Sequence, residues 1–290
     1  MTPISVNFHL LSACDAECTF CFATFRDVPG HLSTTDALHL IDRLRAAGAE
    51  KINFAGGEPT LHRDIGRLVS SARKAGLVTS IISNGARLRP LIEKHAADLD
   101  WVGLSVDSAR EDVQAALGRG RGDHVRRSVE LFDLVHARGL RAKLNTVVTA
   151  LNCDEDMSAF VRRARPDRWK VFQVLPIGGQ NDGRVEPLLI SPDQFRAFVA
   201  RHAALRPEGL GPVAEDNDSM TDSYVMVDPL GRFYSNATGR HVYSAPILEV
   251  GVEAALAQVG WDAEKFVERG GLYDWASPGS GVVQLRSRRG

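Results

Sequence analysis

The stretch Cys14-Asp15-Ala16-Glu17-Cys18-Thr19-Phe20-Cys21 follows an apolar, strand-like run near the start of the chain. Its cysteines have the spacing C-x3-C-x2-C, which predicts a metal or cluster site rather than a disulfide framework. Three protein ligands would leave one iron of a [4Fe-4S] cube free to bind a small molecule. The alternatives are three buried apolar cysteines, or a zinc site, which normally needs a fourth Cys or His nearby.

A second motif, Gly56-Gly57-Glu58-Pro59, directly follows the strand-like run Lys51–Phe54. Paired glycines let a backbone approach a ligand closely, and the Glu58 carboxylate can hold an ammonium group. By itself this motif is compatible with an ordinary turn. Because it follows the cysteine loop by one predicted βα unit, it indicates a small-molecule site shared by the two loops.

The composition sets limits on location and partners. The chain has 290 residues and a formal net charge of −1, which gives no general argument for binding nucleic acid or membranes. Three of its four cysteines lie in one motif, and Cys153 has no obvious partner. With no recognisable signal peptide and no apolar run long enough to span a bilayer, we expect a cytoplasmic protein in a reducing compartment.

Strand-like and helix-like runs alternate through the first part of the chain. The predicted strands cover Ser5–Leu11, Lys51–Phe54, Val78–Ser83, Trp101–Val106, Arg141–Val148 and Arg168–Leu175. The predicted helices cover Thr34–Ala47, Asp64–Ala75, Leu88–Ala96, Val125–Arg138 and Glu155–Ala164, and Thr34 or Thr35 is expected to cap the first. Six such units predict a parallel sheet of the α/β class. They are too few for a closed eight-stranded barrel, so we expect a partial (βα)6 barrel over residues 1–175.

The pattern changes after Leu175. Three glycines in a short stretch indicate a loop, and a helix is predicted at Pro192–Ala204. A hairpin is predicted from Tyr224–Asp228 and Arg232–Tyr234. We expect residues 176–290 to form an extension that packs on the barrel and closes its site.

Polar side chains recur on alternate positions of four predicted strands. They are Asn7, His9, Lys51, Asn53, Lys143, Asn145, Arg168 and Lys170. Because side chains alternate between the faces of a strand, this set should face the barrel interior while helices cover the apolar face. Interior cations are unfavourable without counter-charge, which a triphosphate would supply. The alternative is that they lie at frayed strand ends and extend into solvent.

Together these motifs resemble the viperin family of radical S-adenosylmethionine enzymes. The resemblance runs in order from Ser5 to Trp275 and includes the segments Ser5–His9, Lys51–Pro59, Ser83–Gly85, Lys143–Val147, Asn152–Met157, Arg168–Gln173, Asp222–Tyr224, Val250–Glu253 and Arg269–Tyr273. It implies a [4Fe-4S] cluster and S-adenosylmethionine as cofactors. It also implies conversion of CTP, UTP or GTP to the 3′-deoxy-3′,4′-didehydro analogue through a 5′-deoxyadenosyl radical that takes the ribose C4′ hydrogen. Such products terminate viral RNA chains.

The resemblance also implies roles for individual residues. Cys14, Cys18 and Cys21 would bind the cluster. S-adenosylmethionine would contact Phe20, Gly56, Gly57, Glu58, Pro59, Ser83, Asn84 and Ser105. The nucleoside triphosphate would contact Asn7, His9, Lys51, Lys143, Asn145, Arg168, Lys170, Glu215, Asn217, Arg269 and Gly270. Tyr224 would be a donor late in the reaction.

The stretch Arg269-Gly270-Gly271 receives a separate expectation. Its arginine has no evident acidic partner in the sequence, and two glycines fit a stable helix or strand poorly. We expect this segment to fold over the γ-phosphate when nucleotide binds. A constitutively packed turn is the alternative.

The implied partners are an electron donor of the flavodoxin or ferredoxin type and the iron–sulfur assembly machinery, with neither nucleic acid nor membrane. The amphipathic anchoring helix and the terminal tryptophan of vertebrate viperins have no counterpart in this sequence. Two other functions remain open. One is a different radical enzyme that acts on a peptide or purine nucleotide in cofactor maturation. The other is a non-enzymatic iron–sulfur or zinc protein.

Overall fold

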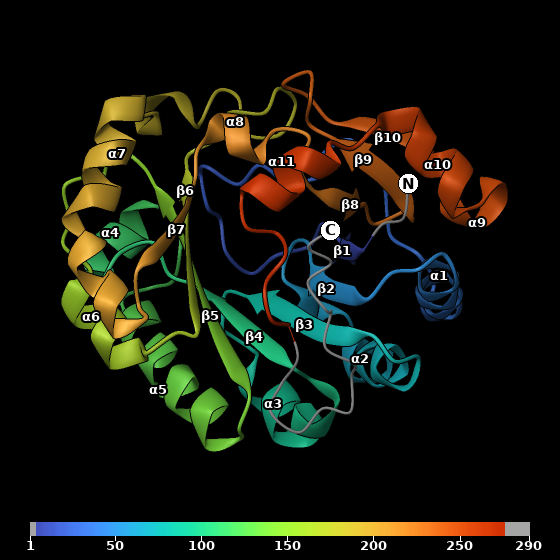
Figure 1. The fold of residues 1–290 in the computed structure, drawn as a ribbon, viewed down its shortest axis with the longest axis horizontal. Helices are drawn as coiled ribbons and strands as arrows, with labels where there is room; N and C mark the ends of the chain where they lie inside the picture. The colour runs from blue at the N-terminus through green and yellow to red at the C-terminus, as the bar shows by residue number, and fades with distance from the viewer. Residues whose placement is uncertain (1–3, 276–290) are drawn as a thin grey trace, which may run out of the picture.

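A ten-stranded sheet in the order β10-β9-β8-β1-β2-β3-β4-β5-β6-β7 curves around a central cavity in the computed structural model, which describes residues 4–275 (Figure 1). The strands are β1 (Ser5–His9), β2 (Lys51–Ala55), β3 (Val78–Ser83), β4 (Trp101–Ser105), β5 (Arg141–Val148), β6 (Arg168–Gln173), β7 (Pro212–Glu215), β8 (Val225–Val227), β9 (Arg232–Ser235) and β10 (Val242–Pro246). The run from β8 through β1 to β7 is parallel, whereas β9 and β10 pair antiparallel. The sheet does not close on itself, so the predicted partial barrel is confirmed.

Helices cover the outer face of the sheet. Along the chain they are α1 (Thr34–Ala46), α2 (Ile65–Lys74), α3 (Arg89–His95), α4 (Glu111–Ala116), α5 (His124–Ala137), α6 (Ser158–Ala164) and α7 (Pro192–Arg201). The extension adds α8 (Asn217–Met220), α9 (Ile247–Val250), α10 (Val252–Val259) and α11 (Ala263–Glu268). Figure 1 shows α11 on the inner side of the curved sheet. None of the helices in the described part of the chain is both long and apolar enough to cross a membrane.

The alternation of faces is as predicted. Phe8, Ile52, Leu144 and Trp169 are almost completely buried on the outer face, where the Trp169 ring packs edge-on against Phe198 of α7. Burial of such side chains is the main stabilising contribution to the fold. Their neighbours in sequence therefore point toward the interior.

Some predicted boundaries are wrong. Helix α1 is capped by Ser33, not by Thr34 or Thr35: the Ser33 hydroxyl accepts from the Asp36 backbone N–H at 3.1 Å. Helix α6 begins at Ser158 rather than at Glu155, because Glu155 instead accepts hydrogen bonds from Ser108 and from the Ala109 backbone N–H.

The extension contributes more strands than the sequence indicated. The predicted hairpin is present as β8 and β9, but β7 and β10 were not predicted. Strand β7 pairs with β6, and β8 pairs with β1, both in parallel. Strand β7 has four residues and β10 has five, which is too short for a clear periodic signal. The segment after residue 175 thus supplies strands to both sides of the six-stranded core.

Candidate active site

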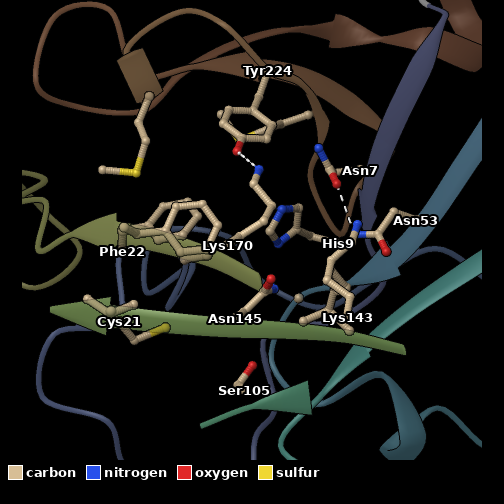
Figure 2. Close-up of a pocket in the computed structure, with 18 of the residues that line it drawn as sticks. Asn7, His9, Cys21, Phe22, Asn53, Ser105, Lys143, Asn145, Lys170 and Tyr224 are labelled. Atoms are coloured by element: carbon tan, nitrogen blue, oxygen red, sulfur yellow. Dashed lines mark hydrogen bonds between the residues drawn. The ribbon is translucent and has the colours of Figure 1, made fainter. Parts of the chain in front are cut away.

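A cavity of about 330 Å³ occupies the interior of the curved sheet. Among the residues predicted for the site, those that line it are Asn7, His9, Cys14, Cys18, Phe20, Cys21, Lys51, Gly56, Gly57, Glu58, Ser83, Asn84, Ser105, Lys143, Asn145, Arg168, Lys170, Tyr224, Arg269 and Gly270. Figure 2 shows ten labelled residues of this wall, which come from the strands of the sheet, from the cysteine loop and from the residue before β8. Three predicted residues, Pro59, Glu215 and Asn217, lie behind the wall.

The cysteine loop is held by two close backbone contacts. The Glu17 N–H donates to the Gly118 carbonyl at 2.9 Å, just beyond α4. Gly118 has a φ of +80°, and a Cβ there would lie 2.3 Å from the Glu17 oxygen. On the opposite side, a Cβ on Gly57 would lie 2.1 Å from the Ala13 oxygen. Only glycine permits this packing, so the position of the loop depends on both contacts.

The donor set of this loop fits an iron–sulfur cube. Cys14, Cys18 and Cys21 all line the cavity, and burial raises the pKa of the free Cys21 thiol to about 12. The described residues include no group of three or more His, Cys, Asp or Glu placed around a single metal ion. A cube makes a different demand, because each cysteine binds a different iron. Three thiols at one end of a cavity fit that demand, and Cys14, Cys18 and Cys21 would hold the cube there.

Arg119, which the sequence reasoning did not single out, lies beside the cysteine loop. Its Nε donates to Asp107 at 2.6 Å, and its guanidinium carbon lies 5.7 Å from the centre of the Phe20 ring. The Asp107 carboxylate raises the pKa of this buried guanidinium against the opposing effect of desolvation, so it stays charged. Arg119 lies in the glycine-rich stretch 118–122, a signal that could have drawn attention to it.

Glu58 is the acidic group at the same end of the cavity. Its side chain is buried and accepts hydrogen bonds from the Thr60 hydroxyl at 2.6 Å, the Ser83 hydroxyl at 2.8 Å and the Asn84 N–H at 2.8 Å. Burial raises the pKa of this carboxyl despite these donors. Ser83 and Asn84 therefore orient Glu58, in addition to lining the cavity themselves.

Five cations occupy the other end of the cavity: Lys51, Lys143, Arg168, Lys170 and Arg269. Desolvation by burial, followed by the repulsion of neighbouring cations, lowers the pKa of Lys51 and of Lys143 to about 7. The group of interior cations that the strand alternation predicted is therefore present in the structure.

Tyr273, at the cationic end, is a second residue to which the sequence reasoning gave no role. Its hydroxyl accepts from Lys51 Nζ at 2.5 Å and from Lys143 Nζ at 3.1 Å. The Arg168 guanidinium lies 4.1 Å from the centre of the same ring and donates to the Gly270 carbonyl at 2.7 Å. Neutral oxygen atoms of the C-terminal segment therefore contact three of the five cations.

Glu215 joins the remaining two cations. Its carboxylate forms ion pairs with Lys170 and, at 3.4 Å, with Arg269, and it accepts from the Tyr224 hydroxyl. Burial alone would raise the pKa of Glu215, but the charges of Lys170 and Arg269 lower it, so the carboxylate stays ionised. Burial raises the pKa of Tyr224 well above its usual range, which keeps the phenol protonated.

The expectation that Arg269 lacks an acidic partner is wrong. Besides Glu215, its guanidinium lies 3.5 Å from the centre of the Tyr224 ring and donates to the Ser223 carbonyl at 3.0 Å. The partner was invisible in the sequence because Glu215 ends β7 and Arg269 follows α11, and only the fold brings these two elements together.

Asn217 and Pro59, which were predicted to contact ligands, do not line the cavity. Asn217 begins α8, and its backbone N–H donates to the Gln173 side chain at 3.3 Å. Pro59 begins a short 3₁₀ turn directly after Glu58. Neither reaches the cavity wall.

The fold and the cysteine loop are those of one superfamily. Residues 9–164 match the family described as the Radical SAM superfamily. Streptococcus suis SuiB bound to S-adenosylmethionine shares the fold, with a TM-score of 0.66 over 80% of this chain and 59% of that one, at 17% identity. Native anSMEcpe with bound AdoMet and Kp18Cys peptide gives a TM-score of 0.68 over 91% of this chain and 82% of that one, at 15% identity. Radical SAM proteins use a [4Fe-4S] cluster and S-adenosylmethionine.

Sequence relatives identify the family within the radical SAM superfamily. An S-adenosylmethionine-dependent nucleotide dehydratase from Flammeovirga pacifica is 42% identical over 93% of this chain and 96% of that protein. One from Lacinutrix mariniflava is also 42% identical, and this chain spans 58% of its length. The RSAD2 dehydratase of Oncorhynchus mykiss is 36% identical over 95% of this chain and 81% of that protein. The chain therefore belongs to the S-adenosylmethionine-dependent nucleotide dehydratase family, the viperin branch of the radical SAM superfamily.

The cysteine loop yields a direct test. Replacing Cys14, Cys18 or Cys21 with alanine should abolish the cluster, because each thiolate holds one iron. Iron and sulfide analysis after anaerobic reconstitution, with the visible absorption spectrum, measures the loss. Cys153→Ala is the matched control, since Cys153 is buried away from the cavity and should leave iron content unchanged. A Cys18→Ala protein with full iron content would contradict the assignment.

Proposed function

We propose that this enzyme dehydrates a nucleoside triphosphate, namely CTP, UTP or GTP, to its 3′-deoxy-3′,4′-didehydro analogue, an antiviral chain terminator. One observation carries the proposal: a single cavity holds a cofactor end and a cationic end. Strand β2 joins them, because Lys51 begins the strand and Gly56, Gly57 and Glu58 follow it directly. Five strand residues span roughly 16 Å, a length that suits a triphosphate at one end and a ribose approaching the cofactor.

At the cofactor end, residues of opposite charge would hold S-adenosylmethionine. Its methionyl part carries an ammonium and a carboxylate, and the buried Glu58 and Arg119 match these in sign. Bound together, a [4Fe-4S] cluster and S-adenosylmethionine supply hydrogen-atom abstraction from carbon, here directed to the ribose C4′. Gly56 and Gly57 allow close backbone approach, and Phe20, Ser83, Asn84 and Ser105 complete the wall.

At the cationic end, the five positive side chains would bind the triphosphate through charge-assisted hydrogen bonds. A polyphosphate offers the further negative charge that five cations need beyond the single Glu215 carboxylate, and a neutral peptide does not. Gly270, which follows Arg269, would let the backbone approach a terminal phosphate. Helix α11 and the residues after it lie over the interior and would exclude water from the reaction.

Within the cationic end, Lys170, Tyr224 and Glu215 form a hydrogen-bonded group that can hold a proton. Lys170 Nζ donates to the Tyr224 hydroxyl at 2.6 Å (Figure 2). That hydroxyl donates to the Glu215 carboxylate. Departure of the 3′-hydroxyl as water would take up one proton, which the Lys170 ammonium can provide, and one electron, which the external reductant would supply. Tyr224, kept protonated by burial, is the proposed donor that passes this electron to the substrate late in the reaction.

The partners follow from the same function. Radical SAM enzymes need an external reductant, and we propose a cytoplasmic donor of the flavodoxin or ferredoxin type. Loading of Cys14, Cys18 and Cys21 would depend on iron–sulfur assembly proteins. The cavity lining contributed by α8, β8 and α11 supports the proposal that residues 176–290 act as an extension that closes the nucleotide site.

One assay tests the function. The reconstituted enzyme is incubated with S-adenosylmethionine, dithionite and each of CTP, UTP, GTP and ATP. The expected products are 5′-deoxyadenosine and a nucleotide lighter by one water. Equal 5′-deoxyadenosine formation with a nucleoside and with its triphosphate would refute the role of the cationic end.

Removal of one interior cation should weaken nucleotide binding selectively. Lys143→Ala should reduce the binding free energy by roughly 1.5–3 kcal/mol, the range for hydrogen bonds to charged groups. Equilibrium dialysis with the nucleoside triphosphate measures the change, and iron content should not change. Lys74→Ala, at an exposed position in the last turn of α2, is the control and should bind as the parent does.

Nucleotide binding should also take up protons. Lys51, Lys143 and Lys170 are largely neutral at pH 8 because burial lowers the pKa of each to about 7. A triphosphate favours their charged forms, so binding at pH 8 should take up to about three protons. Calorimetry in buffers of different ionisation enthalpy counts them, and Lys143→Ala should lower the count by about one. No proton uptake would contradict contact of these lysines with phosphate.

The same shifts have a consequence for stability without ligand. All three lysines bind protons more weakly in the folded chain than in the unfolded chain, where the pKa of a lysine side chain is near 10.5. Between about pH 7 and 10 the unfolded state therefore binds more protons, and the contribution of these lysines to stability increases with pH. Nucleotide affinity should change in the opposite direction over that window.

A further inference from the structure

The glycine-containing loop that follows β6 contacts the cysteine loop from behind the cavity wall. Two of its residues, Gln180 and Asn181, are each only 1% exposed, although both carry polar amide side chains. Neither residue lines the cavity. Amide groups are rarely buried so completely unless their polar atoms have hydrogen-bond partners. The partners of these two side chains therefore show what the loop holds in place.

Asn181 joins the cysteine loop to the end of β6. Its side-chain nitrogen donates to the Phe20 carbonyl at 3.0 Å and to the Leu175 carbonyl at 2.9 Å. Its side-chain oxygen accepts from the Ile177 N–H at 2.8 Å, which fixes the orientation of the amide. Phe20 directly precedes Cys21 in the chain. One buried amide thus holds the backbone on the N-terminal side of the third cysteine.

Gln180 holds the turn on the other side of Cys21. Its side-chain oxygen accepts from the Phe25 N–H at 2.7 Å and from the Thr24 hydroxyl at 2.9 Å. Its side-chain nitrogen donates to Asp27 at 2.9 Å. Phe25 has a φ of 50°, which is uncommon for a bulky residue and persists where the surrounding contacts enforce it. Gln180 therefore supports a strained turn just after the last cysteine.

The segment between these two anchors contributes to the cavity wall. Cys21 and Phe22 both line the cavity, and Figure 2 shows them on the same side of it. Since Asn181 holds the backbone before Cys21 and Gln180 holds the backbone after it, a single loop fixes both sides of this thiol. The two glycine contacts described above act on the earlier part of the cysteine loop, before its second cysteine.

We propose that Gln180 and Asn181 are positioning residues for the [4Fe-4S] cluster, and that they form a brace that keeps Cys21 in the geometry for binding iron. The inference concerns the cofactor alone and does not depend on which nucleotide the enzyme uses. Iron leaves a buried cluster when the surrounding loop opens locally, and contacts that hold the loop closed lower the population of that open state. The brace should therefore slow the loss of iron.

Asn181→Asp tests the brace with little change in side-chain size. The substitution replaces the donating nitrogen with an oxygen that repels the Phe20 and Leu175 carbonyls. The full chain is reconstituted anaerobically, and transfer of its iron to an excess of the ferrous chelator ferrozine is followed over time. Release should be roughly 10–100-fold faster than in the parent, the effect of losing buried hydrogen bonds.

A spectroscopic measurement separates positioning from general stability. The EPR spectrum of the reduced cluster depends on the arrangement of its three thiolates. In Asn181→Asp the line shape of the remaining cluster should differ from that of the parent. If the residue acted only on overall stability, less cluster would remain but its spectrum would be unchanged, and that result would overturn the proposal.

The matched control is Asn152→Asp. Asn152 is also 1% exposed, and its side-chain nitrogen also donates to two backbone carbonyls, those of Asp107 and Val147 near the ends of β4 and β5. This variant should lower the free energy of unfolding of the apoprotein as Asn181→Asp does, but should release iron within about threefold of the parent rate. Equal acceleration of iron release in the two variants would overturn the proposal.

A second pair of variants decides the matter if Asn181→Asp does not fold. Thr24→Val removes the hydroxyl that donates to Gln180 and keeps the shape of the side chain. It should speed iron release by roughly 3–10-fold. Thr146→Val removes a buried hydroxyl that donates to the Val106 carbonyl, outside the brace, and should release iron as the parent does. A Thr24→Val protein with the release rate of the parent would refute the brace.

Discussion

Positive charge on the inner face of the sheet is the constraint that shapes this site. Five cationic side chains line one end of a cavity of about 330 Å³, and Glu215 pairs with two of them. Such a group is tolerated in a protein interior only where neighbouring oxygens and a partly neutral state of the lysines offset the repulsion. Burial therefore lowers the pKa of Lys51 and Lys143, and Tyr273 provides their shared acceptor. These features make the cationic end of the cavity complementary to a highly charged anion.

The opposite end is built from backbone contacts rather than from charge. The cysteine loop lies between Gly57 on one side and Gly118 on the other, and each glycine approaches a loop carbonyl more closely than a Cβ would allow. Glu58 is then fixed by donors from the end of β3, and Arg119 by Asp107. The loop and its two charged neighbours thus have fixed positions relative to the strand ends. A cofactor that carries both an ammonium and a carboxylate fits this pair.

The C-terminal extension joins the two ends into one site. It supplies Glu215 from β7, Tyr224 from the start of β8, and Arg269 and Tyr273 from the residues around and after α11. Tyr224 accepts a hydrogen bond from Lys170, and Tyr273 accepts one from Lys143, both in the six-stranded core. Arg269 packs on the Tyr224 ring within the extension. Because the extension pairs with both β1 and β6, its side chains approach the cavity from two directions.

The sequence by itself determined the local chemistry and the repeating architecture. Cysteine spacing and the Gly-Gly-Glu-Pro turn are local patterns that predicted the cofactor loops. The alternation of strand-like and helix-like runs predicted the partial barrel, and the period-two alternation of polar residues on β1, β2, β5 and β6 predicted its polar interior. Tertiary structure alone decided which distant residues meet. Glu215 and Arg269 are 54 positions apart, and Tyr273 reaches a lysine 222 positions away. Arg119 lies in a loop without periodicity, and β7 has four residues. Periodicity in the sequence indicates which face of a strand or helix a side chain occupies. Contacts between separate elements depend instead on how the whole chain packs. Short strands and loops have no periodic pattern from which these contacts could be predicted.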